Sequence, residues 1–317
     1  MTMADVLKKA TRDAYGEGLV ALGAELDNLV VLDADLAAAT KTGMFKKAYP
    51  DRFFDCGIAE QNMMGIAAGL ATAGKIPVAA SFAMFATGRA YEQVRNTIGY
   101  PHLNVKIGAT HAGISVGEDG ATHQCCEDSA LMRTIPGMTI LNPADYVEAG
   151  QALRAAVAMN GPVYMRFGRL AIPVIFDDSY RFEIGRGVQL TEGSDVAIVA
   201  TGLLVGEALI AAEQLKNEGI SARVINISTI KPLDKAIIAK AAAETGVIVT
   251  AEEHSVIGGL GSAVAEAVCE TTPVPVVRVG VNDEFGKSGP AVELLQVFGL
   301  CAANIAAKAK EAVKLKK

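Results

Sequence analysis

Residues 55–65 read Asp-Cys-Gly-Ile-Ala-Glu-Gln-Asn-Met-Met-Gly and join a short apolar run, Phe53-Phe54, to a long segment of small residues. Within that segment Gly65, Gly69 and Ala73 recur at every fourth position, which is typical of one face of an α-helix. The pattern predicts a strand, a turn at Gly57, and a helix whose first turn contains Glu60.

Glu60 is the candidate functional residue of this stretch. An acidic residue in the first turn of a helix is common because it complements the positive end of the helix dipole. Here, apart from Gln61 and Asn62, the residues that follow are small or apolar, which predicts a helix buried on nearly every side. A carboxylate kept from water favours its protonated form, so Glu60 could give a proton to a ligand nitrogen and take it back near neutral pH.

Strands and helices alternate along the whole chain. In the first half we expect strands at 29–33, 76–81, 105–110, 139–141 and 163–166 and helices at 60–74, 88–99 and 144–159. After a polar linker, 177–193, we expect strands at 195–201, 222–227, 247–251 and 276–281 and helices at 205–217, 234–243 and 262–270. This alternation predicts an α/β chain of two doubly wound domains, residues 1–178 and 179–317.

Composition narrows the class of protein. The 317 residues are half hydrophobic, 20% charged and free of Trp, which describes a tightly packed chain long enough for two domains. The net charge of −6 argues against a nucleic-acid binder. Lys75 and Arg89 interrupt the longest apolar region, so no membrane span is expected. The basic tail 308–317 is expected to be a solvated helix face.

The termini and cysteines suggest a cytoplasmic location. Thr2 and Asp5 resemble a helix cap, and no apolar signal core is evident. The cysteines are odd in number and lack CxxC spacing, which fits reduced thiols. His123, Cys125 and Cys126 lie close in sequence, but without a second ligand pair they give little support to a metal site, so we expect no metal ligands here.

Carboxyl ends of strands in the first half of the chain carry the side chains expected of a pocket. Ligands of such sheets lie off these ends. Acids, aromatic rings and cations follow the strands there, namely Asp33, Asp35, Glu60, Phe82, Phe85, His111 and Arg166. The loop between Ile107 and Cys126 adds Asp119 and His123 among several glycines. This density of titratable groups predicts a site for one small ligand.

Two further motifs have competing interpretations. Gly113-Ile-Ser115-Val-Gly117 matches the GxSxG pattern of serine hydrolases, with Asp234 and His254 as possible partners, but an acidic loop follows the serine where a helix is required. The segment 258–262, Gly-Gly-Leu-Gly-Ser, could hold an anion on its amides or form a tight strand-to-helix turn. We favour the turn.

Taken together, these residues resemble the carboxy-terminal half of transketolase. Residues 57–60, Gly-Ile-Ala-Glu, resemble the family's pyrimidine-binding Gly-Ile-x-Glu. Residues 117–124, Gly-Glu-Asp-Gly-Ala-Thr-His-Gln, match its Gly-Glu-Asp-Gly-x-Thr-His-Gln. The resemblance covers both expected domains. Deoxyxylulose-phosphate synthase and the beta subunits of 2-oxo-acid dehydrogenases share the architecture and remain alternatives, although the Glu-Asp pair and Thr-His-Gln favour transketolase.

The resemblance implies thiamine diphosphate as cofactor. It implies that Glu60 bonds the ring nitrogen of the aminopyrimidine and promotes the tautomer that deprotonates the thiazolium carbon. Ile58 would support the bent cofactor, Phe82 and Phe85 would line and stack on the pyrimidine, and Asp35 would meet the cofactor across the subunit interface.

The same resemblance implies a sugar-phosphate site. Asp119 and His123, which complete the catalytic set, would hold hydroxyls of the donor sugar, whereas His111, Arg166 and Arg12 would clamp its phosphate. Without the resemblance, a solvated charge on the first helix describes Arg12 nearly as well.

The chain also departs from the family. Gly88 replaces an aromatic residue, and Ala39, beside Thr40, replaces a phosphate-binding serine. No Gly-Asp-Gly occurs anywhere, although the family uses it to bind the diphosphate and Mg²⁺. The resemblance therefore implies a separate amino-terminal chain that carries the diphosphate and magnesium ligands, and a second copy of this chain, in a heterotetramer.

With that partner, the chain is expected to transfer a two-carbon ketol unit from a ketose phosphate to an aldose acceptor, as in the pentose phosphate pathway. Less favoured interpretations are a serine hydrolase that uses Ser115 and a partner subunit without catalytic activity. The donor and acceptor sugars do not follow from the sequence.

Overall fold

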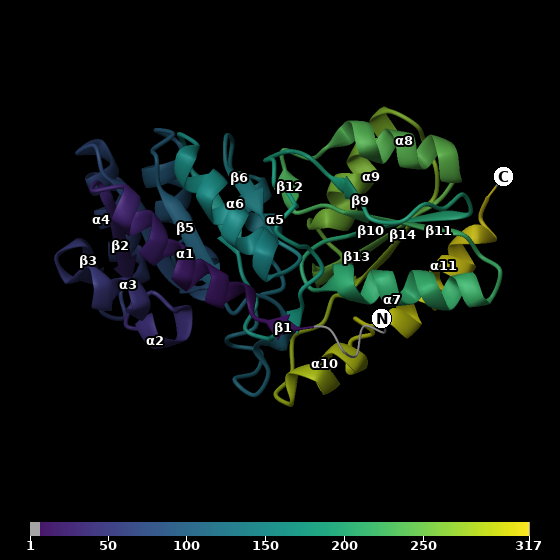
Figure 1. Cartoon of the computed structure of the whole chain (residues 1–317), viewed down its shortest axis with the longest axis horizontal. Coiled ribbons are helices and arrows are strands. Elements are labelled where there is room, and N and C mark those ends of the chain that lie inside the picture. The colour runs from purple at the N-terminus through teal and green to yellow at the C-terminus, as the bar shows by residue number, and fades with distance from the viewer. Residues whose placement is uncertain (1–6, 317) are drawn as a thin grey trace.

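The computed structural model describes residues 7–316 and consists of two α/β domains that lie side by side (Figure 1). The cap expected at Thr2 and Asp5 lies outside the described residues. The central strands of both sheets, β2, β4, β5, β7, β10, β11 and β13, are fully or largely buried, as apolar runs in parallel sheets require. The predicted fold class of two doubly wound domains is confirmed.

The first sheet has seven strands in the order β12-β6-β7-β5-β4-β2-β3. Their bounds are β2 Leu29–Asp33, β3 Phe53–Asp55, β4 Ile76–Phe82, β5 Lys106–Thr110, β6 Thr139–Leu141, β7 Val163–Arg166 and β12 Thr229–Lys231. All neighbours pair in parallel except β12, which is antiparallel to β6. The carboxyl ends of β2 to β5 and β7 therefore meet at one edge of the sheet.

Helices cover both faces of this sheet. On one face α1 Thr11–Glu25 packs against α6 Tyr146–Ala158, with α2 Ala37–Thr40, α3 Gly43–Ala48 and the 3₁₀ turn η2 Pro50–Arg52 beside α1 (Figure 1). On the other face lie α4 Glu60–Thr72, α5 Asp128–Arg133 and two π-helical turns, η3 Met84–Arg89 and η4 Gln93–Gly99. The helix expected at 88–99 thus forms as two π-helical segments.

The second sheet has the order β14-β13-β10-β11-β9. Its strands are β9 Val188–Gln189, β10 Val196–Ala200, β11 Ala222–Asn226, β13 Ile248–Ser255 and β14 Val276–Val281, of which β9 alone pairs antiparallel. One face is covered by α7 Leu204–Asn217 and α11 Ala302–Val313, the other by α8 Lys235–Thr245 and α9 Leu260–Glu270.

One strand from the second half of the chain belongs to the sheet of the first domain. β12 follows the second domain's β11 in sequence but pairs with β6 of the first sheet, and Figure 1 shows it between the two domains. Within the first domain, β1 Lys8–Lys9 pairs with β8 Ile172–Pro173, close to the expected linker. Such short strands carry too little apolar pattern to be predicted, so the sequence did not reveal this connection.

The prediction that the helix after Glu60 is buried on nearly every side was wrong. Met63, Met64 and Ala67 are buried in α4, whereas Gly65 and Gly69 are exposed, and a Cβ added at either glycine would meet nothing within 4 Å. The small residues at the fourth-residue spacing therefore form an open face of α4. The burial of Glu60 comes from its own end of the helix.

Toward the carboxyl terminus, residues Ala291–Val313 are long and apolar enough by composition to cross a membrane. They form two helices, α10 Ala291–Val297 and α11, separated by a turn at Gly299 with φ of 68°. Ile305, Ala309 and Ala312 of α11 pack into the core of the second domain. Because one face of α11 is buried in protein and the two helices are not continuous, we regard them as core helices.

Candidate active site

Glu60 lies at the carboxyl edge of the first sheet and is buried, with 1% of its surface exposed. It is the first residue of α4, directly after the turn at Gly57, whose φ is +67°. A positive φ of this kind is the reason for glycine at this turn. The sequence prediction of a buried acid in the first helical turn is confirmed.

Two side chains that the sequence did not single out hold the Glu60 carboxylate. Arg89 Nη1 donates to Oε2 at 2.7 Å, and Ser81 Oγ donates to Oε1 at 3.3 Å. Glu60 is almost fully buried, whereas the Arg89 side chain is 46% exposed. The ion pair compensates the cost of burying the Glu60 charge, which is large for an unpaired carboxylate.

Aromatic rings lie next to this pair. Phe82 and Phe85 are stacked with centroids 5.8 Å apart, and the guanidinium carbon of Arg89 lies 4.5 Å from the Phe85 centroid. The His123 ring meets the Phe85 ring edge-on at 5.2 Å, and the His111 ring stacks on Phe82 at 3.8 Å. Stacked and edge-to-face packing of this kind builds a partly apolar wall of aromatic rings.

Cationic groups lie at the other end of the wall. Arg12 Nη1 lies 3.2 Å from His111 Nε2 and donates to the carbonyl oxygen of Ala39 at 2.9 Å. Since arginine can only donate, His111 Nε2 is the acceptor, and the proton on Nδ1 is donated to Thr110 Oγ1 at 2.9 Å. His111 is therefore a neutral imidazole in this structure.

The electrostatic surroundings also favour the neutral form of His111. Burial, followed by the charges of Arg12 and Arg169 and the nearby His123, lowers the pKa of His111 to about 3. Burial also lowers the pKa of Arg12, with Arg169 acting in the same direction. The Nε atom of Arg12 is buried and has no hydrogen-bond partner. Arg12, His111 and Arg169 thus form a cluster that an anionic ligand group would stabilise.

Arg166 is not part of this cluster, in contrast to the role implied by the resemblance. Its Nε donates to Asp128 Oδ2 at 2.8 Å, and its Nη2 donates to the carbonyl oxygens of Glu253 and Cys125. Arg166 and Asp128 are both buried, which makes them a structural ion pair within the first domain, and the bond to the Glu253 carbonyl links Arg166 to the second domain. Arg169, three residues further on, lies close enough to Arg12 and His111 to lower the pKa of both, so Arg169 and not Arg166 is the arginine of this cluster.

Three predicted site residues are exposed and form no hydrogen bond with Glu60, Ser81 or Arg89. Ile58 is 77% exposed in the turn before α4. Asp35, with φ of 61°, receives no side-chain partner but donates its backbone N–H to Asp55 Oδ1. Asp119 lies in the exposed part of the 117–124 loop. Their assigned roles stay predictions.

The serine-hydrolase alternative is not supported by the geometry. Ser115 is buried in a 3₁₀ turn, and its backbone N–H donates to Glu253 Oε1 at 2.6 Å. Asp234 instead caps α8 through Ile237 N, and both ring nitrogens of His254 are used by the backbone of Ser255 and Ala130. Neither side chain therefore activates the Ser115 hydroxyl.

The glycine-rich segment 258–262 binds the side-chain carboxyl group of Glu252 from the same chain. Glu252 accepts hydrogen bonds from Leu260 N at 2.6 Å and from Gly261 N at 2.8 Å, at the start of α9. A Cβ at Gly259 would lie 2.1 Å from Glu252 Oε2, so glycine is needed for this close approach. The segment is a strand-to-helix turn, as favoured from the sequence.

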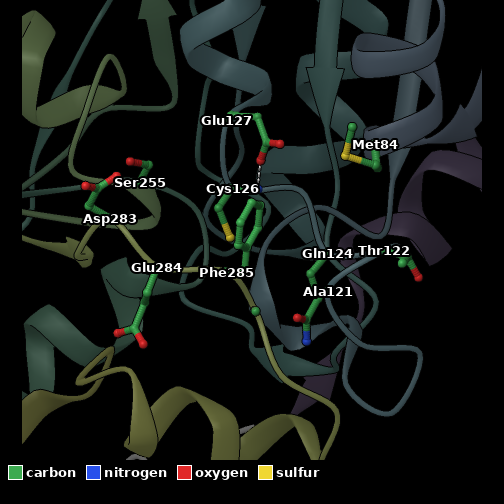
Figure 2. A pocket seen from close by; sticks show the side chains of 11 residues that line it. Met84, Ala121, Thr122, Gln124, Cys126, Glu127, Ser255, Asp283, Glu284 and Phe285 are labelled. Carbon is green, nitrogen blue, oxygen red and sulfur yellow. Dashed lines mark hydrogen bonds between the residues drawn. The ribbon is translucent and has the colours of Figure 1, made fainter.

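A cavity of about 490 Å³ opens beside the site loop, at the junction of the domains. As Figure 2 shows, Met84, Thr122 and Cys126 line it from the first domain, and Ser255 and Phe285 from the second. None of Glu60, Phe82, Phe85 or His111 lines it. The cavity adjoins the candidate site without containing its charged groups.

Within residues 7–316 there is no cluster of three or more His, Cys, Asp or Glu side chains that could hold a metal ion. All five cysteines are free thiols.

The residues that sequence analysis missed are Arg89, Ser81 and Arg169. Ser81 could have been found, because it directly precedes Phe82 at a strand's carboxyl end. Arg169 lies three residues beyond Arg166, and only the fold shows which arginine is buried. Arg89 reaches Glu60 through the π-helical turn η3, which an α-helical pattern does not predict.

Comparisons with known proteins agree with this arrangement. The family model of the transketolase pyrimidine-binding domain matches residues 8–174, and that of the transketolase C-terminal domain matches residues 185–305. These two matches lie on either side of the expected boundary at residues 178 and 179, whose position itself stays a prediction.

Similar proteins come from several sources. A putative transketolase C-terminal section from Methanocaldococcus jannaschii is 52% identical, covering 96% of this chain and 97% of the relative. A 6-deoxy-6-sulfo-D-fructose transketolase subunit from Clostridium is 45% identical, covering 96% and 95%. Human transketolase is 38% identical, and the match spans 92% of this chain but 47% of the human protein.

Among solved structures, a split-gene transketolase described as an inactive beta4 tetramer is 54% identical, with a TM-score of 0.91 and coverage of 97% of this chain and 99% of that chain. Transketolase from Leishmania mexicana is 26% identical with a TM-score of 0.82. The match covers 98% of this chain and 47% of the Leishmania chain. This chain belongs to the transketolase family, where it corresponds to the carboxy-terminal section of split transketolases.

Proposed function

We propose that this chain is the pyrimidine-binding subunit of a two-chain transketolase that transfers a two-carbon ketol unit from a ketose phosphate to an aldose acceptor. The observation that carries the proposal is the buried Glu60 carboxylate beside the stacked rings of Phe82 and Phe85. This combination fits the edge and faces of an aminopyrimidine ring. Bound thiamine diphosphate would supply the carbon nucleophile that cleaves and forms carbon–carbon bonds next to a carbonyl.

The protein's own residues fit one end of the cofactor. Glu60 would exchange a proton with the pyrimidine ring nitrogen, and Phe82 and Phe85 would hold the ring flat. Ile58 is exposed directly before Glu60 and so is available to support the bent cofactor. The lack of a metal-ligand cluster in residues 7–316 supports a partner chain that holds the diphosphate and Mg²⁺.

A second copy of the chain is part of the proposal. The outer face of α4 has exposed small residues, Gly65 and Gly69, with open space above them. Ile66 on α4 and Phe54 on the edge strand β3 are exposed apolar side chains. Such a surface suits close packing between subunits, which would bring Asp35 of one copy to the site of the other. We also place the assembly in the cytoplasm, which the five free thiols support.

The cationic cluster suits an anionic end of the sugar. Arg12 and Arg169 provide charge, and neutral His111 becomes a better partner once an anion approaches, because the anion favours imidazolium. Asp119 and His123 on the neighbouring loop would bind sugar hydroxyls. The Clostridium relative is named for a sugar with a sulfonate group, and a 39% identical subunit from Phocaeicola vulgatus is named for apulose 4-phosphate, so the cluster would accept either chemistry.

The assembled pair and the variant Glu60→Gln provide the test. The variant should lower kcat by about 10³-fold, because proton exchange with the ring is lost, while the melting temperature changes little. Glu25→Gln is the matched control, since Glu25 lies at the far end of α1 in a surface pair with Arg154. Near-normal turnover by Glu60→Gln in an assembly that binds the cofactor would refute the proposal.

A further inference from the structure

Arg89 makes two contacts with the site in this structure. One nitrogen of its guanidinium donates to Glu60 Oε2 at 2.7 Å, and its guanidinium carbon lies 4.5 Å from the centroid of the Phe85 ring. A planar cation that stacks on an aromatic ring and bonds a carboxylate is stabilised by both contacts.

These are the two contacts that the proposed function assigns to the aminopyrimidine ring. That ring is also flat and nitrogen-bearing, and it would need the Glu60 carboxylate and the Phe85 ring. Ser81 already takes the other Glu60 oxygen, Oε1, at 3.3 Å. Arg89 and the pyrimidine would therefore compete for Oε2.

The two side chains of the ion pair differ in how readily each can move away from the other. Glu60 is 1% exposed and fixed at the first turn of α4, whereas the Arg89 side chain is 46% exposed. Returning a half-exposed guanidinium to water costs little, because it is already partly solvated. Glu60, in contrast, cannot leave and needs a partner as long as it is charged.

We propose that Arg89 is a placeholder for the aminopyrimidine ring: it occupies the pyrimidine subsite in the free subunit and swings toward solvent when the cofactor binds. The inference rests on the proposed function. It adds that the chain keeps Glu60 paired with Arg89 until the assembled site takes up its cofactor. Arg89 then lowers the apparent cofactor affinity, since part of the population is not competent to bind.

The first test is calorimetric titration of the assembled pair with thiamine diphosphate and Mg²⁺, comparing wild type, Arg89→Gln and Arg95→Gln. Arg95 is an exposed arginine on η4 and corrects for the loss of one positive charge near an anionic ligand. We expect the Kd of Arg89→Gln to be at least threefold below that of Arg95→Gln. A smaller decrease, no change or an increase would overturn the inference.

The second test uses the wild-type assembly and therefore does not depend on how the variant folds. Modification of arginine by phenylglyoxal is followed by mass spectrometry with and without thiamine diphosphate, with Arg95 as internal reference. A displaced Arg89 should react at least threefold faster when the cofactor is bound. Slower or unchanged modification would overturn the inference, because Arg89 would then stay beside the ring.

The two proposals fail in different ways. If the wild-type assembly does not bind thiamine diphosphate, the proposed function is wrong and the placeholder is wrong with it. If the wild type binds but Arg89→Gln is no tighter, only the placeholder is wrong.

Discussion

The carboxyl edges of the two sheets have the same architecture but differ in how their polar groups are satisfied. At the first edge, the Glu60 charge is balanced by a half-exposed Arg89, and Arg12 Nε is buried without a partner. At the second edge, Glu252 binds the backbone amides of α9, and both nitrogens of His254 are hydrogen-bonded to backbone. The charged groups of the first edge are open to a ligand, whereas Glu252 and His254 of the second edge are satisfied by the chain's own backbone, and the unpartnered atoms there are the neutral Asn226 Oδ1 and Ser228 Oγ.

This difference shows that a doubly wound fold does not by itself create a site. Both sheets place helix starts and polar residues off their strand ends, as the fold requires. What distinguishes the first edge is a set of groups that a ligand would complete. The following predictions test whether the second edge and the domain junction are structural while the first edge is functional.

The largest effect is expected at the domain junction. Arg166→Gln leaves Asp128 buried without its cation, so the free energy of unfolding should fall by about 3–5 kcal/mol. Chemical denaturation of the isolated chain measures this change. Unaltered stability together with a weakened affinity for the sugar phosphate would instead show that Arg166 binds the substrate.

A pH-dependent effect is expected at Glu253, which bonds Ser115 N across the junction. Burial raises the pKa of Glu253 from 4.5 to about 7, an increase that Arg166 partly opposes. The folded chain thus holds a proton that the unfolded chain has released, so stability falls as pH rises from about 4.5 to 7, by on the order of 3 kcal/mol.

Glu253→Gln should remove this decline, because glutamine does not titrate and can still accept from Ser115 N. The variant should therefore be the more stable protein at pH 8, with no advantage at pH 4.5. Denaturation curves across this pH range check the prediction. A variant that loses stability equally at every pH would show that the acid is charged in the folded chain.

A smaller loss is expected at the closed second edge. Glu252→Ala leaves the amides of Leu260 and Gly261 without their acceptor and should lower the free energy of unfolding by about 2 kcal/mol. The Kd for thiamine diphosphate in the assembled pair should not change. A large change in that Kd would mean that the second edge also takes part in cofactor binding.

The smallest effect is expected at Arg169, at the open edge. Arg169→Gln should raise KM for a ketose phosphate about tenfold by removing one cation near His111, with kcat and stability nearly unchanged. Steady-state kinetics of the assembled pair measure this effect. The contrast with Arg166→Gln is the informative result, since of two arginines three residues apart one would stabilise the fold and the other would bind the substrate.

The fold and much of the site could be predicted because they rest on local patterns. Strand and helix alternation gave the two domains, and short motifs located Glu60, Phe82, Phe85, His111 and His123, of which all but Glu60 are linked by ring contacts. The Glu60 prediction succeeded because a helix start is a local feature.

The failures share a physical cause, namely dependence on long-range packing. The pair of Arg89 with Glu60 depends on a π-helical turn and on residues 29 positions apart in sequence. The pair of Arg166 with Asp128 depends on how β7 and α5 meet, and β12 crosses between domains. No pattern within a short window contains this information.

The proposed bond between Glu60 and the cofactor ring is tested most directly by the protonation state of that ring in the assembled pair. Thiamine diphosphate labelled with ¹⁵N in its pyrimidine ring would be bound to wild type and to Glu60→Gln, and the ring nitrogen observed by NMR. We predict that this nitrogen carries or shares a proton in the wild type and resembles the free cofactor in Glu60→Gln. The same resonance in both proteins would contradict the claim that Glu60 bonds the ring.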